Sequence, residues 1–467
     1  MVLSRIWSAF IIVAIVVASI KYLFSPNYKA IYNDMVVGKG GDTVAIASQP
    51  LASLPMNVQY ALETAPDTKV DHIGYKKVEG SSSVQIYRIQ STDGVIGTSE
   101  TAVKICLGLI GIMTLFMGFM SIAEKAGGIN LLSRIIQPFF SRLFPEIPKN
   151  HPSFGHMTLN FSANLLGLDN AATPFGLKAM ESLQTLNPSK DTASNAQVMF
   201  LCLHASGLTL IPVSIIAIRA SMGSQTPTDI FLPCLIATFA ATMAAMIIVS
   251  IKQRINLFQP IVLAYIGGIS AAIALLVVYL VQLSKDELDG FSKVLSNGMI
   301  LFIFFAIILG GIYKKINIFD AFIEGAKEGF WTCVKIIPYL VGMLIAISLL
   351  RTSGVFEIII DGMKYVASAA NMDTRFVDGL PTALIKPLSG SGARGMMVDT
   401  MTTFGPDSFP SRLAGILQGS SDTTFYVIAV YFGAVGIRNI RYTVGTMLLA
   451  DLVGIITAIS LAYLFFG

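Results

Sequence analysis

Two ionisable side chains lie in stretches that are otherwise apolar or weakly polar. Arg394 lies in the run PLSGSGARGMM, and Asp422 lies in LQGSSDTTFYV. An ionisable residue inside a membrane span costs about 2.5 to 3.5 kcal/mol on insertion scales, so its presence indicates a function. A guanidinium would attract an anionic solute, and a carboxylate would bind a coupling Na⁺ or H⁺. In the alternative interpretation, which the residues leave open, Arg394 and Asp422 neutralise each other.

Further polar residues gather in four segments between apolar runs, at 164–173, 204–209, 389–394 and 418–424. Backbone that leaves a helix at membrane depth is tolerated only where protein or a water-filled cavity satisfies its N–H and C=O groups. We therefore expect the four segments to line a solute site near the middle of the membrane. The expected solute-binding residues are Asn164, Asp169, Asn170, Thr173, His204, Ser206, Thr209, Ser389, Ser391, Arg394, Gln418, Ser420, Asp422, Thr423 and Thr424.

Each of these polar residues also has a structural interpretation. The neighbouring glycines would allow tight turns or close helix packing. The asparagines and Thr173 would satisfy the backbone of their own segment, and Asp169 would cap a helix. His204 would be a hydrogen-bonded packing residue and not a proton relay. The serine and threonine hydroxyls would bond to the carbonyl four residues back.

The composition is that of a membrane protein. The chain has 467 residues, of which 54% are hydrophobic and 13% charged, and its mean hydropathy is +0.69. Soluble proteins average about 25% charged residues, so we expect a polytopic membrane protein. A net charge of +4 spread over many loops gives no basis for nucleic-acid binding. The four cysteines lie in apolar runs without CxxC spacing, so we expect packing roles and no metal site.

Apolar runs long enough to cross a bilayer need about 17 to 25 residues. One soluble-looking insert, 25–101, separates the first two runs, and its part SSSVQIYRIQST alternates like a strand. We expect this insert to lie outside the cytoplasm. Two further segments, 158–185 and 376–402, are apolar but interrupted. The nine predicted spans are 6–24, 103–123, 196–220, 231–251, 258–283, 299–313, 331–350, 413–435 and 442–466.

The chain contains an internal repeat. The run TAVKICLGLIGIMTLFMGFM in the first half corresponds to TCVKIIPYLVGMLIAISLL in the second. An amphipathic stretch, an interrupted segment and a span with a polar cluster follow each run. The repeat predicts a first domain at 1–255, which contains the insert, a linker helix at 256–296, and a second domain at 297–467. Because the first helix also has a counterpart at 299–313, we expect it to be retained and not cleaved as a signal peptide.

Lysine and arginine favour cytoplasmic loops, which gives a test of topology. With a cytoplasmic N-terminus, most basic residues outside the insert fall on the inside, while Arg219 and the near-neutral loop SKDELDGFSK fall outside. This bias favours inverted repeats, each with a re-entrant helical hairpin. The predicted fold is an all-α polytopic membrane protein of about nine transmembrane helices plus two hairpins.

Long motifs in both halves resemble known families. NLLGLDNAATPFGLKAME and LCLHASGLTLIPVSIIAIRA resemble the spore maturation protein A family, and GPDSFPSRLAGILQGSSDTTFYVIAVYFGAVGIR resembles the spore maturation protein B family. Both families carry the Gate, or nucleoside recognition, domain, which is distantly similar to concentrative nucleoside transporters. The resemblance implies a fusion of the two proteins, in which two re-entrant hairpins and two partly unwound helices form a solute site. Those transporters place carboxylates at two positions, where this chain has Asp169 and Asn170, and Asp422.

We therefore expect a multi-pass protein of the bacterial plasma (inner) membrane that works as a secondary transporter of a small polar or anionic metabolite by alternating access. Its partners would be the lipid bilayer and a small-molecule solute, with homo-oligomers left open. No cofactor is expected besides a coupling Na⁺ or H⁺. The alternative function is a non-transporting membrane factor for envelope or spore maturation. An enzyme is not expected, because the chain lacks HExxH and shows no serine paired with a base at catalytic spacing.

Overall fold

The computed structural model describes residues 2–25, 28–50, 62, 67–70, 73–77, 83–148, 151–166, 169–283 and 285–467. These residues form two compact units, one of 3–102 with 344–362 and the other of 103–343 with 363–467. Seven described helices are long and apolar enough to cross a membrane: Trp7–Phe24, Val95–Lys125, Phe231–Gln253, Pro260–Leu280, Val294–Tyr313, Ile318–Thr352 and Thr443–Phe466. The chain is therefore a polytopic membrane protein, and its membrane part is all-α.

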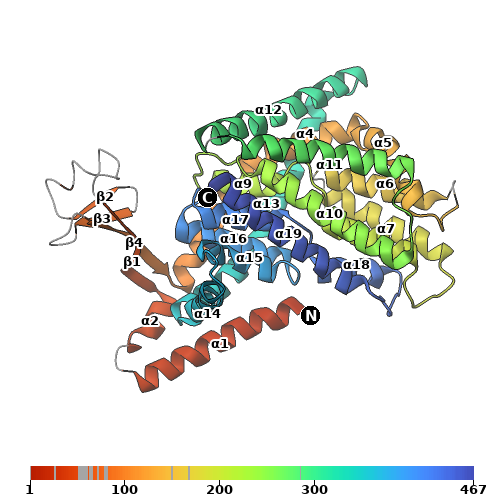
Figure 1. Cartoon of the computed structure of the whole chain (residues 1–467). Helices are drawn as coiled ribbons and strands as arrows, with labels where there is room; N and C mark the ends of the chain where they lie inside the picture. The colour runs from red at the N-terminus through yellow and green to blue at the C-terminus, as the bar shows by residue number, and fades with distance from the viewer. Residues whose placement is uncertain are drawn as a thin grey trace. The chain divides into compact units, whose positions relative to one another are not determined.

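The first unit contains the insert that the composition singled out. Two helices, α1 (Val2–Phe24) and α2 (Ile31–Val36), precede a four-stranded sheet (Figure 1). The strands β1 (Gly38–Pro50), β2 (Asp67–Val70), β3 (Ile73–Lys77) and β4 (Ser83–Asp93) pair antiparallel in the order β1-β4-β3-β2. The strand predicted from SSSVQIYRIQST is β4. The sheet adds a small β element to a chain that is otherwise helical.

The second unit is helical, and its element order repeats. In the first half the order is α4 (Val95–Lys125), α5 (Gly128–Leu143), α6 (Pro152–Leu165), α7 (Asp169–Leu186), α8 (Asn195–Ser206), α9 (Val213–Ser221) and α10 (Phe231–Gln253), followed by α11 (Pro260–Val281). The second half runs through α12 (Lys285–Tyr313), α13 (Ile318–Thr352), α14 (Val355–Ala369), η3 (Arg375–Gly379), α15 (Leu380–Ile385), α16 (Gly390–Phe404), α17 (Phe409–Gly419), α18 (Thr424–Ala434) and α19 (Thr443–Phe466). The pairs α6/α7 and α15/α16 are the two interrupted segments.

Two of the nine predicted spans are broken helices. The span 196–220 divides into α8 and α9, because Gly207 takes a left-handed conformation (φ +52°) and Pro212 precedes the next helix. The span 413–435 divides into α17 and α18, with residues 420–423 between them outside both helices. Each half-helix is too short to cross a bilayer alone. The two breaks leave backbone groups that need partners at that depth.

Loops of the two halves contact each other reciprocally. The carbonyl of Asp191, before α8, accepts from the backbone N–H groups of Arg438 and Asn439, after α18, at 2.8 and 2.9 Å. A corresponding contact exists with the roles of the two halves exchanged. Asp407, before α17, accepts from Arg219, at the end of α9, at 3.0 Å. Reciprocal contacts of this kind arise when two copies are related by a twofold axis. The inverted orientation of the repeats in the membrane stays a prediction.

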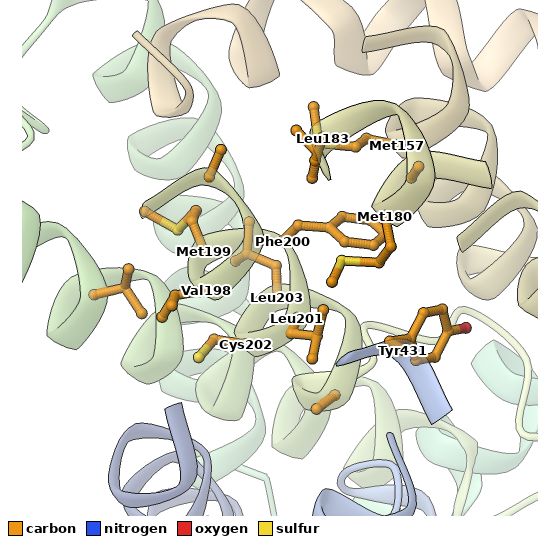
Figure 2. Close-up of a cluster of buried hydrophobic side chains, with 14 of the residues drawn as sticks. Met157, Met180, Leu183, Val198, Met199, Phe200, Leu201, Cys202, Leu203 and Tyr431 are labelled. Carbon is orange, nitrogen blue, oxygen red and sulfur yellow. The ribbon is translucent and has the colours of Figure 1, made fainter. Parts of the chain in front are cut away.

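The core of the second unit encloses α8. Every residue of α8 from Ala196 to Ser206 is buried, and most are apolar, as expected for an enclosed helix; Gln197, His204 and Ser206 are buried polar residues. Figure 2 shows the side chains of α8 beside Met157 of α6, Met180 and Leu183 of α7, and Tyr431 of α18. The first hairpin therefore packs on α8, which continues into the first helix break.

Gly176, in α7, fixes how closely the first hairpin approaches α18. A Cβ atom at this position would lie 2.4 Å from the Tyr431 ring and 2.9 Å from the Asn160 amide nitrogen. Gly176→Ala is therefore expected to lower the free energy of unfolding by about 1 to 3 kcal/mol, the usual cost of overpacking. Thermal unfolding of the purified protein in detergent measures the change. Gly155→Ala in α6 is the control, since its Cβ would meet nothing within 4 Å; equal loss in both variants would contradict the prediction.

Candidate functional site

The two helix breaks cross each other. The backbone N–H of Asp422, in the α17–α18 break, donates to the carbonyl of Ala205, at the end of α8, at 2.7 Å. A Cβ atom on Gly207 would lie 3.8 Å from the same nitrogen. The two halves thus satisfy part of each other's unwound backbone. The crossing also brings together side chains that are more than 200 residues apart in the sequence.

Each hairpin is anchored to the broken helix that follows it. Leu165, at the end of α6, accepts at its carbonyl from the N–H of Leu210 at 2.8 Å. Pro387, between α15 and α16, accepts in the same way from Phe425, in the first turn of α18, at 2.9 Å. Gly390 approaches the second break so closely that a Cβ atom would lie 2.6 Å from Thr423 Oγ1. The hairpins and the breaks therefore form one assembly.

A cavity of about 340 Å³ lies at this crossing. All four segments that were expected to line a site contribute to its wall. The predicted residues that line it are Asn164, Thr173, His204, Thr209, Arg394, Gln418, Asp422 and Thr423. Met113 and Met117 of α4 and Thr332 of α13 close it on another side. The structure thus brings eight of the fifteen predicted residues to one cavity.

Five other predicted residues make hydrogen bonds within the protein, four of them to residues no more than three positions away. Ser206 and Ser420 donate to the carbonyls of the third residue before them, and Ser389 caps α16 by accepting from the N–H of Gly392 at 2.9 Å. Ser391 lies 3.2 Å from Ser389 Oγ, and Thr424 donates to Asp451 at 2.6 Å. Asp169 and Asn170 belong to the backbone of α7, but their side chains, like Gly167, lie outside the described residues.

His204 connects both halves through its ring. Its Nδ1 lies 3.0 Å from Asn160 Oδ1 and 2.8 Å from Asn164 Nδ2, both on α6. Its Nε2 lies 3.9 Å from Asp422 Oδ2. The ring packs edge-on against Tyr431 with centroids 4.7 Å apart. Only 5% of the side chain is exposed, so its polar contacts are made almost entirely within the protein.

Sequence reasoning missed two ionisable residues at this site. Lys386, directly before Pro387, is buried, lines the cavity, and donates from Nζ to the Gln418 carbonyl at the C-terminal end of α17 at 2.7 Å. Asp451, on α19, is buried behind the cavity and accepts hydrogen bonds from Thr424 and Ser421. The signal that singled out Arg394, an ionisable group in apolar sequence, also identifies Lys386 and Asp451.

A second polar cluster, which we call the Arg219 network, lies apart from the cavity lining. Arg219 is fully buried and donates to Asp229 at 2.9 Å, Asp407 at 3.0 Å and the Pro406 carbonyl at 2.8 Å. Arg412 donates to the other oxygen of Asp229 at 2.8 Å. The topology prediction places Arg219 on the outer side of the membrane, and the structure shows in addition that its side chain is buried. This network ties the loop after α9 to the loop before α17.

Fold and site define a membrane protein with two hairpins anchored on two crossed, broken helices around a polar cavity. The nucleoside recognition (Gate) family model matches the chain twice, at residues 106–222 and 333–438. These matches begin at corresponding points of α4 and α13 and extend past α9 and α18. The family model therefore detects the same repeat as the element order.

Two relatives agree with the family match. The chain is 47% identical to spore maturation protein B of Bacillus subtilis over 173 residues, which cover 37% of this chain and 96% of the relative. It is 42% identical to spore maturation protein A of the same organism over 156 residues, covering 33% and 80%. No solved structure matches the chain. The chain belongs to the nucleoside recognition (Gate) family, and the matches are consistent with a fusion of proteins similar to these two.

Proposed function

We propose that this protein is a secondary transporter of a small polar or anionic metabolite, and that the cavity at the crossed helix breaks is its solute site. The observation that carries the proposal is the cavity itself, because all four broken or interrupted segments supply polar groups to its wall. Half-helix ends that meet near the middle of the membrane are the usual arrangement of solute sites in secondary transporters. A volume of about 340 Å³ suits a small metabolite.

The charges of the lining favour an anionic solute. Lys386 and Arg394, both on the second hairpin, line the cavity, and Asp422 is the single carboxylate in its lining among the described residues. Gln418 is buried, and its Oε1 has no hydrogen-bond partner within the described part of the chain. An acceptor without a partner in a polar cavity favours a solute that also carries a hydrogen-bond donor. We therefore infer an anionic metabolite with hydroxyl or amine groups.

The mode of transport follows from the same elements. In the proposed cycle the hairpins expose the cavity to one side of the membrane at a time, by an elevator-like or another alternating-access motion. The proposal includes a plasma-membrane location with a cytoplasmic N-terminus, in agreement with the distribution of lysine and arginine. A coupling Na⁺ or H⁺ would make the transport secondary active.

The names of the two relatives favour a second candidate function. Both describe spore maturation and name no solute. The alternative is therefore a membrane factor for envelope or spore maturation that uses the same fold without solute flux. The two candidates differ in one respect that can be measured, which is whether the cavity binds a small molecule.

A solute that occupies the cavity is expected to stabilise the purified protein against heat. A ligand at 100 times its Kd adds about 2.7 kcal/mol to the free energy of unfolding. Thermal unfolding in detergent would be screened with nucleosides, dicarboxylates and amino acids. We expect a concentration-dependent rise of Tm with one class, and the same class should fail to stabilise Arg394→Gln. A flat response to all three classes would favour the non-transporting factor.

A further inference from the structure

The imidazole of His204 sits where three elements meet at the cavity wall. Asn160 and Asn164 of α6 approach its Nδ1, Asp422 of the α17–α18 break approaches its Nε2, and Tyr431 of α18 packs against its ring. The first hairpin and both broken helices therefore contact one titratable ring. A neutral imidazole carries its proton on one nitrogen only, and the partners of each nitrogen decide which one.

Asn160 decides the tautomer. Its amide nitrogen donates to the Ala172 carbonyl at 2.6 Å, which leaves its Oδ1 facing His204 Nδ1 at 3.0 Å. A side-chain hydrogen bond to Tyr431 also holds the Asn160 amide. Because an amide oxygen only accepts, Nδ1 must carry the proton and donate. In the structure the Asn164 amide nitrogen lies 2.8 Å from the same Nδ1, so this tautomer requires the Asn164 amide to be turned by 180°, which exchanges its nitrogen and oxygen.

The other nitrogen of His204 is left with a lone pair that faces a carboxylate. Nε2 lies 3.9 Å from Asp422 Oδ2, and both atoms are acceptors while the ring is neutral. The other charged or titratable groups around the cavity, within the described residues, are Lys386, Arg394, Cys234 and Tyr426 on its wall, Tyr431 against the ring, and Asp451 behind Ser421 and Thr424. A proton on one of these two acceptors turns that atom into a donor, so that the two groups attract each other.

We propose that His204 Nε2 is a proton-binding site, and that its occupancy pairs an imidazolium with the Asp422 carboxylate. The proton enters from water in the cavity, forms the N–H bond with the Nε2 lone pair, and returns to water when the site opens to the other side. This assignment rests on the proposed transport function and makes H⁺ the coupling ion. A hard cation such as Na⁺ would seek oxygen ligands, whereas the imidazole nitrogen binds a proton.

Protonation would also change how the halves are held together. The imidazolium gives a charge-assisted contact between α8, in the first half, and the α17–α18 break, in the second. The neutral ring gives none. The proton therefore adds an attraction between the two crossed helix breaks, next to the proposed solute site. The Asp422 side chain is 49% exposed, so cavity water reaches the carboxylate beside Nε2.

Nitrogen-15 NMR of the full-length protein labelled at histidine tests the site with protons alone. The His204 signals are assigned by difference from His204→Gln. We expect the tautomer with the proton on Nδ1 at alkaline pH and a second proton on Nε2 as the pH falls. In Asp422→Asn this second step should move to lower pH by about one unit, a tenfold weaker proton affinity. Asp373→Asn, which removes an exposed carboxylate, should leave it unchanged.

Two results would overturn the proposal: a His204 ring that carries its proton on Nε2 at alkaline pH, or a protonation step that is the same in Asp422→Asn as in the unaltered chain. The first is read on the unaltered chain, with His204→Gln used only to assign the signals, so it does not depend on how Asp422→Asn folds. If the NMR result is as expected but no solute class stabilises the protein, the transport function fails while the proton site stands. If a solute stabilises the protein but the ring does not titrate as described, the proton site fails alone.

Discussion

Arg219→Ala is expected to destabilise the protein by about 3 to 5 kcal/mol, more than any other single substitution considered for the fold. The guanidinium is fully buried and donates to two carboxylates and a carbonyl. Its loss would leave Asp229, only 2% exposed, without one of its two arginine partners. Arg219→Lys should recover only part of the loss, since an ammonium cannot reproduce the planar set of donors. Chemical unfolding of the purified protein in detergent, followed by circular dichroism, measures the difference.

The matched control is an ion pair on the surface of the same unit. Lys125 pairs with Glu324, and their side chains are 39% and 63% exposed. Exposed pairs contribute about 0 to 1 kcal/mol, so Lys125→Ala should change the free energy of unfolding by no more than that. If both substitutions had equally small effects, the Arg219 network would not stabilise the contact between the two halves, and the prediction would be wrong.

The segments that line the cavity could be predicted because their polar residues lie in otherwise apolar runs. Arg394, Asp422 and His204 are polar groups in apolar runs, and such groups need a specific partner or a function. The glycines and prolines around them also marked the interrupted segments. Periodicity identified the long spans, since a length of about 20 apolar residues is imposed by the bilayer. The membrane fold and eight of the cavity residues could therefore be predicted.

The helix break inside the predicted span 196–220 was harder to recognise. α8 is buried from Ala196 to Ser206, and apolar residues make up most of both α8 and α9. Only the GLTLIP run at 207–212 marks the unwound backbone. Hydrophobic length therefore predicts one continuous span over 196–220, although the polar segment 204–209 within it is expected to line the site.

Long-range pairing was also hidden from the sequence. Arg219 and Asp407 are 188 residues apart, so no local pattern shows that the Arg219 side chain is buried beside Asp407. The orientation of His204 likewise depends on Asn160, which lies in the interrupted segment 158–185 but is not among the expected solute-binding residues. A residue whose role is to hold another is set by tertiary contacts, and periodicity does not report those contacts.

Arg394→Gln is expected to reduce solute uptake at least about tenfold, because a charged hydrogen bond to an anion is worth about 1.5 to 3 kcal/mol. The residue is half-buried and lines the cavity, so the amide should remain accommodated and the protein folded. Lys386→Met should have a similar effect on uptake. It should also lower stability, since Lys386 Nζ bonds the end of α17. Arg375→Gln, an exposed cation paired with Asp373, should leave uptake unchanged.

The most direct test of the central claim is uptake into proteoliposomes of the solute class that stabilises the protein. Vesicles containing the unaltered chain should accumulate the labelled solute faster than protein-free vesicles, and faster still under an inward proton gradient. Vesicles containing Arg394→Gln should accumulate it at less than about a tenth of that rate. Uptake equal to that of protein-free vesicles, or equal rates for the unaltered chain and the Arg394 variant, would contradict the assignment of the cavity as a transport site.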